Sequence, residues 1–180
     1  APAARPTNIP SGHYVLDNHH STLIARVMHM GVSLYTIRFD TLAASFDYDP
    51  AHPEATRLRA SVDLASLDVG ADYSKTFANE FLKADKFPVA TFVSTALTPT
   101  APGRGTMSGD LTLMGVTKPV TFDVLLVGAG HELLPLPFGQ SAAGFEATTE
   151  IRRSAFGSKR LSGLVGDEVT LQIDAEFDRK

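Results

Sequence analysis

The chain has 180 residues, 43% of them hydrophobic and 20% charged, which is typical of one globular domain and excludes a disordered chain. Its net charge of −4 argues against a nucleic-acid partner, because such proteins usually carry a basic stripe. The lack of cysteine excludes disulfides and thiolate metal sites. No apolar run approaches the ~20 residues that a membrane-spanning helix needs, so we do not expect the chain to be an integral membrane protein.

The first residues, Ala1-Pro2-Ala3-Ala4, contain no Met and resemble the small-residue string near a signal-peptide cleavage site. They favour a periplasmic or secreted protein, although a trimmed chain would start in the same way. No linker or internal repeat interrupts the sequence, which predicts one domain over residues 1–180 with 1–11 as an N-terminal extension.

Alternation of apolar and polar residues with a period of two predicts strands along most of the chain. The clearest example is 168–177, where Val169, Leu171 and Ile173 alternate with polar residues. Such two-faced alternation is typical of antiparallel sheets with one buried and one wet face. The predicted strands lie near 12–17, 22–30, 33–48, 57–64, 88–97, 106–114, 118–127, 143–151 and 168–177.

One segment, residues 72–85, has a helical period, because Tyr73, Phe77 and Phe81 recur at every fourth position. One helix among many consecutive strands does not form βαβ units, so a parallel sheet is not expected. The pattern predicts an all-β, antiparallel fold of about eight strands, either a closed barrel or a sandwich.

The segment Gly128–Gly144 reads as a long loop that contains Leu133, Leu134, Leu136 and Phe138. We expect these apolar residues to fold back onto the body of the protein. The alternative is a lid or a protein-contact surface.

Motifs for catalysis and metal binding are absent: the sequence contains no nucleophile elbow, phosphate loop or His-Glu-x-x-His segment. His13, His19, His20 and His29 fall close together in the chain, but no carboxylate–histidine pattern supports zinc. We therefore predict no catalytic residue, no metal and no cofactor.

Basic residues gather at Arg152-Arg153 and Lys159-Arg160, after a predicted strand. A run of this kind is usually a solvated face, but at a barrel rim it could bind the anionic head group of a lipid. Arg153 and His20 are the head-group candidates, and the alternative for Arg153 is a structural pair with Asp17 or Glu168.

A barrel of this size either fills with side chains or encloses one small ligand. The residues expected to face the interior, and so to line a ligand pocket, are Leu23, Ala25, Val27, His29, Phe39, Phe46, Phe92, Leu111, Leu113, Phe122 and Phe145.

Five segments resemble the YceI-like, polyisoprenoid-binding family, and they occur in the family's order. They are YVLDNHHSTL at 14–23, FPVATFVST at 87–95, SGDLTLMGVTKPV at 108–120, GFEATTEIRRSAFG at 144–157 and VGDEV at 165–169. The resemblance implies an eight-stranded, lipocalin-like barrel with an apolar tunnel for a polyisoprenoid or another long-chain amphiphile. It also implies a bacterial protein that is commonly exported to the periplasm.

The chain departs from the family pattern inside the barrel. Ala25 stands where the family usually has Phe, and Ile37 and Ala44 stand where it has Gly. Tyr73–Phe77 replaces an Arg-Asp-x-His-Leu segment. The space beside Ala25 is filled either by a neighbour such as Ile37 or by the ligand, and we favour the ligand.

The leading hypothesis is therefore a carrier for an isoprenoid chain of the quinone or prenyl diphosphate type, with a hydrophobic small molecule as its partner. A second hypothesis is a lipid-modifying or stress-response enzyme that uses His20, His29 or Arg153. A third is a filled barrel that contacts other proteins through 128–144. The oligomeric state stays open, a homodimer included.

Overall fold

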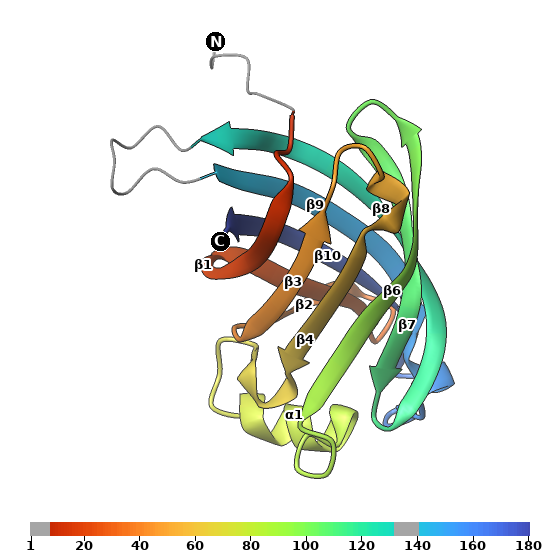
Figure 1. The fold of residues 1–180 in the computed structure, drawn as a ribbon. Helices are drawn as coiled ribbons and strands as arrows, with labels where there is room; N and C mark the ends of the chain where they lie inside the picture. The colour runs from red at the N-terminus through yellow and green to blue at the C-terminus, as the bar shows by residue number, and fades with distance from the viewer. Residues whose placement is uncertain (1–7, 132–140) are drawn as a thin grey trace.

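A computed structural model describes residues 8–131 and 141–180 of the chain, which form a strongly curved antiparallel sheet that closes on itself (Figure 1). The strands are β1 (Gly12–His29), β2 (Ser33–Phe39), β3 (Leu42–Tyr48), β4 (Arg57–Asp63), β5 (Leu67–Asp68), β6 (Val89–Ala101), β7 (Arg104–Leu113), β8 (Val116–His131), β9 (Ser141–Arg152) and β10 (Val165–Arg179). The helices are α1 (Ser74–Leu82) and three short 3₁₀ turns, η1 (Pro53–Ala55), η2 (Leu64–Ser66) and η3 (Arg153–Phe156).

The pairing of β1 with β10 closes the barrel. β1 is long enough to pair with β10 on one side and with both β2 and β3 on the other, so β2 and β3 act as one interrupted barrel strand. β5 pairs only with β2 and lies outside the ring, so the described strands form a closed barrel of eight. This confirms the predicted fold class and decides for the barrel against the sandwich.

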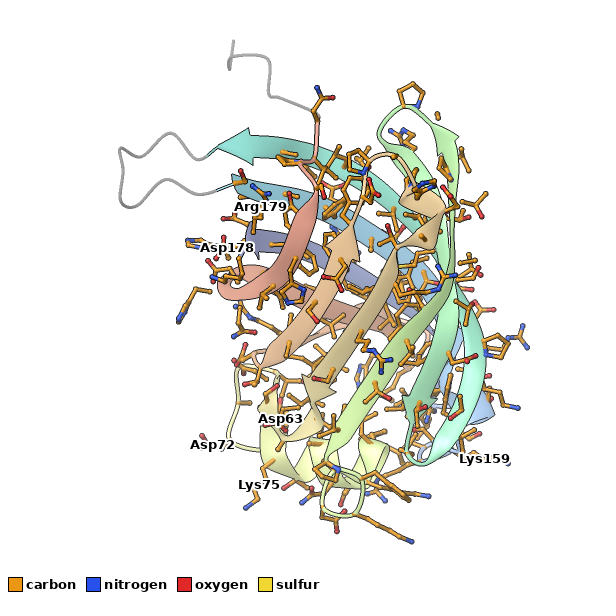
Figure 2. All side chains as sticks on the ribbon, in the orientation of Figure 1. Asp63, Asp72, Lys75, Lys159, Asp178 and Arg179 are labelled. Atoms are coloured by element: carbon orange, nitrogen blue, oxygen red, sulfur yellow. The ribbon has the colours of Figure 1, made fainter. Side chains whose placement is uncertain are left out.

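The helix α1 covers one end of the barrel (Figure 1), where it packs against η2 and β5. Its buried Ala78 joins Leu64, Leu67 and Phe156 in the larger of two apolar cores. The labelled side chains of Asp72 and Lys75 lie at this same end (Figure 2). The barrel is therefore plugged at the helix end by side chains of the connections.

The structure differs from the sequence expectations in the continuity of the first strands. Residues 12–17 and 22–30 form one strand, β1, whose register with β10 shifts between Asp17 and Thr22. The expected strand 33–48 is interrupted at Asp40 and Thr41, because their N–H groups bond to the carbonyl and the hydroxyl of Ser66 instead of to β1. Local hydrogen bonds of this kind compete with the ladder and leave no periodic signal in the sequence.

The expected loop 128–144 is shorter than predicted. Residues 128–131 continue β8 and residues 141–144 begin β9, with Gly128 paired to Gly144. Leu133, Leu134, Leu136 and Phe138 lie outside the described residues, as does most of the expected extension 1–11.

Candidate functional site

A cavity of about 440 Å³ occupies the barrel interior. Its wall is formed mainly by the inward residues of the strands, with Leu58, Ala60 and Val62 on β4 and Leu171, Ile173 and Ala175 on β10. Alternation along each strand explains this wall, because every second side chain faces the interior. The interior is thus not filled by side chains, contrary to the third sequence hypothesis.

Three aromatic rings form one side of the cavity. The ring of Phe46 lies 4.9 Å from that of Phe177 and 6.1 Å from that of Phe145, both edge to face. Tyr14 stacks behind Phe46 at 5.1 Å, and its hydroxyl donates a hydrogen bond of 2.8 Å to the Pro10 carbonyl. Edge-to-face rings prefer this geometry, so the three rings stabilise one another on this wall.

The cavity reaches the barrel end opposite α1. Pro53 and Thr56, from the connection between β3 and β4, line it there, together with Gly103 of the β6–β7 turn and the strand ends Ala101 and Arg104 that flank it. Figure 1 shows both connections at the end of the barrel away from the helix. Since α1 plugs the other end, the β3–β4 and β6–β7 connections form the mouth.

Polar groups on the wall are few. Among residues 8–131 and 141–180, Arg104 is the only charged residue that lines the cavity. Thr56 is 4% exposed, and its Oγ1 is the one buried side-chain nitrogen or oxygen of the described chain without a hydrogen-bond partner. The cavity therefore suits an apolar molecule with at most one polar end.

The structure divides the residues expected to face the interior into three groups. Those on the cavity wall are Leu23, Phe46, Phe92, Leu111, Phe122 and Phe145. Ala25, Val27, Phe39 and Leu113 are buried, but they do not line the cavity. His29 is exposed, so its expected place inside the barrel is wrong; it lies at the helix end, 6.1 Å from the Tyr35 ring.

Ala25 lies directly across the β1–β2 ladder from Ile37, which packs into the same core. The small residue and the large residue are thus neighbours, and the extra volume of Ile37 compensates for the small side chain of Ala25. The expectation that ligand occupies the space beside Ala25 is not supported, because the cavity wall does not include it.

His20 is exposed and lies away from the cavity wall. Its Nδ1 is 2.6 Å from Oδ2 of Asp17, and this hydrogen bond is the main cause that lowers the pKa of the Asp17 carboxyl. Glu176, on β10, places its carboxylate in the same group, in which one ligand atom per residue lies within 4.8 Å of the others. The register shift in β1 brings Asp17 and His20 together, a contact that the sequence did not indicate.

Arg153 is a structural residue rather than a head-group ligand. It is 8% exposed, and its guanidinium donates to the carbonyls of Gly166 at 2.8 Å, Val165 at 2.9 Å, Arg160 at 2.9 Å and Ser158 at 3.1 Å. The expected alternatives, a pair with Asp17 or Glu168, are replaced by these carbonyls. The head-group prediction is wrong because the donors are used inside the protein, near α1 rather than at the mouth.

The other members of the expected basic cluster are also dispersed. Arg152 lies 3.7 Å from Glu168, and Arg160 lies 2.8 Å from Glu80 on α1. His20, His29 and Arg153, any one of which the enzyme hypothesis could use, occupy separate places. Thr56 was missed because it lies in a connection, where no periodicity predicts orientation.

A family model described as YceI-like domain matches residues 14–177. A UPF0312 protein of Pseudomonas fluorescens is 38% identical over 172 residues, which cover 91% of this chain and 85% of that protein. A UPF0312 protein of Shewanella baltica is 34% identical over 179 residues, which cover 97% of this chain and 92% of that protein.

Solved structures resemble this barrel as well. BcnA of Burkholderia cenocepacia has a TM-score of 0.78 at 26% identity, and the match covers 89% of this chain and 98% of BcnA. A polyisoprenoid-binding domain from Saccharophagus degradans has a TM-score of 0.71 at 15% identity, over 93% of this chain and 98% of that domain, which shows a shared fold. In the described residues, no helix is long and apolar enough to cross a bilayer.

Proposed function

The chain belongs to the YceI-like family, and from that premise we propose that it binds one long-chain apolar molecule, a polyisoprenoid of the quinone or prenyl diphosphate type, inside the barrel and carries it. The observation that carries this proposal is the cavity of about 440 Å³ with its almost entirely apolar wall. Pockets for small molecules usually measure about 300–1,000 Å³ and have this composition. The Saccharophagus degradans domain, described as polyisoprenoid-binding, has the same fold.

Burial of hydrocarbon supplies enough free energy for such binding. Each buried CH₂ contributes about 0.8 kcal/mol, so one isoprene unit contributes roughly 3–4 kcal/mol before the loss of its freedom is counted. Micromolar affinity requires about 8 kcal/mol net, so roughly four units, which contribute about 12–16 kcal/mol, suffice after an association cost of about 4 kcal/mol is subtracted. The proposed activity is binding alone, and no reaction is part of it.

A cavity-filling variant tests the proposal. Ala60 lines the cavity and pairs across the sheet with Ala44 on one side and Phe92 on the other. The Ala60→Phe substitution places a ring in the open interior and should weaken binding of a long isoprenoid more than tenfold. The matched control is Ala96→Phe, at an exposed position of β6 off the cavity wall, which should bind as the wild type does.

Native mass spectrometry of protein purified from its source cells gives the second readout. A retained hydrocarbon of defined mass supports the proposal, and its loss in Ala60→Phe assigns it to the cavity. Equal binding by wild type and Ala60→Phe, with both folded by circular dichroism, would contradict the proposed site. A periplasmic or secreted location remains a proposal, and fractionation of the source cells tests it.

A further inference from the structure

One histidine and two carboxylates meet on the outer face of the barrel, where β1 and β10 close it. Asp17 and His20 belong to β1 and Glu176 belongs to β10, and one ligand atom of each lies within 4.8 Å of the others. The chain neighbours of the two acids, Leu16 and Ala175, line the cavity, so Asp17 and Glu176 project outward. The group is therefore separate from the apolar interior.

An irregularity of β1 brings the histidine to the group. The register of β1 with β10 shifts between Asp17 and Thr22, and residues 18–21 lie between the two registers. In a regular strand, residues three positions apart project to opposite faces. Here Nδ1 of His20 lies 2.6 Å from Oδ2 of Asp17, so the irregularity turns both side chains to one face. Irregularities of this kind often redirect a side chain at a functional site.

The chain itself positions the two carboxylates. Ser21 is 4% exposed, and its Oγ donates to the Asp17 carbonyl at 2.7 Å and accepts from the Glu176 N–H at 3.0 Å. The N–H of His19 donates to Oδ1 of Asp17 at 2.8 Å, while Oδ2 of the same carboxylate contacts His20. Since these bonds already order the group, binding of an ion costs little further conformational freedom.

The surface around the group is acidic. Asp17 stands directly opposite Glu176 in the β1–β10 ladder, and Asp174 stands directly opposite Glu146 in the β9–β10 ladder. Like charges that face each other across a ladder are destabilising. A cation between the carboxylates of Asp17 and Glu176 replaces their repulsion by attraction to the ion.

We propose that Asp17, His20 and Glu176 bind a divalent transition-metal ion of the class of Zn²⁺. One imidazole nitrogen and two carboxylate oxygens are ligands that Zn²⁺ accepts at about 2.0–2.2 Å, with water at the fourth position. The side chain of His20 is 67% exposed, so its ring can turn to bring the three atoms to these distances. The imidazole favours such an ion over Mg²⁺ and Ca²⁺, which prefer oxygen ligands alone.

The proposed ion joins the two strands whose pairing closes the barrel, so it stabilises this closure. It replaces the sequence expectation of no metal. It is also independent of the proposed carrier function, because none of its ligands lines the cavity.

Calorimetric titration of the untagged full chain, first treated with a chelator, tests the site with ZnCl₂ and MgCl₂ as probes. The wild type should bind one Zn²⁺ per chain, about a hundredfold more tightly than Mg²⁺. His20→Ala and Glu176→Gln should each weaken Zn²⁺ binding about tenfold or more. Zn²⁺ should also raise the melting temperature of the wild type, and this rise should be smaller in both variants.

His13 provides the matched control. Its Nδ1 lies 2.8 Å from Oδ1 of Asp47, a similar exposed pair, but the described residues place no third ligand beside it. His13→Ala should therefore bind Zn²⁺ as the wild type does. Equal loss in His13→Ala and His20→Ala, equal affinity for Zn²⁺ and Mg²⁺, or no Zn²⁺ binding by the folded wild type would overturn the inference. Circular dichroism of each variant confirms that a loss of binding is not a loss of fold.

Discussion

Replacement of Arg153 by methionine tests the structural role of the buried guanidinium. Methionine has a similar length and leaves little empty volume, so the change mainly removes the hydrogen bonds to Ser158, Arg160, Val165 and Gly166. A hydrogen bond to a charged donor contributes ~1.5–3 kcal/mol net. Because several of these carbonyls are only partly buried, water can replace some of the bonds, and we expect a loss of about 3–5 kcal/mol in the free energy of unfolding.

The measurement is urea denaturation followed by far-ultraviolet circular dichroism, with Arg152→Met as the control. Arg152 is a neighbour with an exposed side chain 3.7 Å from Glu168, so its loss should change stability by less than ~1 kcal/mol. Arg153→Lys should be intermediate, because an ammonium group cannot reach carbonyls on several sides at once. A loss below ~1 kcal/mol in Arg153→Met, equal to that of the control, would refute the structural role.

Three further predictions concern polar groups. Thr56→Val should raise the free energy of unfolding of the ligand-free protein by ~1 kcal/mol, since it removes a buried hydroxyl without a partner; a lower stability in denaturant would contradict this. The hydrogen bond from His20 lowers the pKa of Asp17 in the folded state, so the wild type should be more stable than Asp17→Asn above pH ~4. Urea denaturation at a series of pH values should show that this difference in stability disappears as the pH falls through the pKa of Asp17 in the folded protein. Burial and the Tyr73 hydroxyl raise the pKa of Tyr35 to about 12, so the free energy of unfolding should fall as the pH rises from ~10 toward that value. Ultraviolet titration of Tyr73→Phe should show that the pKa of one tyrosine moves back toward ~10.

Most of the fold could be predicted from the alternation of apolar and polar residues and from the order of the motifs. The run at 168–177 predicted both the strand β10 and its inward face, and Leu171 and Ile173 line the cavity as the period of two requires. The helical period of Tyr73, Phe77 and Phe81 predicted α1, which runs from Ser74 to Leu82. These features are local, since side-chain direction in a strand or a helix follows from backbone geometry alone.

The interior of the barrel required the tertiary structure. Ala25 and Leu23 share a face of β1, yet only Leu23 lines the cavity, because the distribution of empty space depends on partners such as Ile37 from another strand. Similarly, the sequence could not predict that the hydroxyl of Thr56 has no hydrogen-bond partner, because the absence of a partner depends on every residue that surrounds the oxygen in the folded protein.

Arg153 shows the same division between local and long-range information. Its sequence, two arginines after a strand, suggested a charged rim, and nothing local distinguishes Arg153 from Arg152. The chain reversal between η3 and β10 surrounds one of them with the carbonyls of Ser158 and Gly166 and leaves the other in solvent beside Glu168. The sequence by itself determined which residues form strands and which face each strand presents, because these depend on neighbours in the chain. The closure of β1 on β10, the cavity and the partner of each buried polar group were decided by contacts between distant segments, which no local pattern encodes.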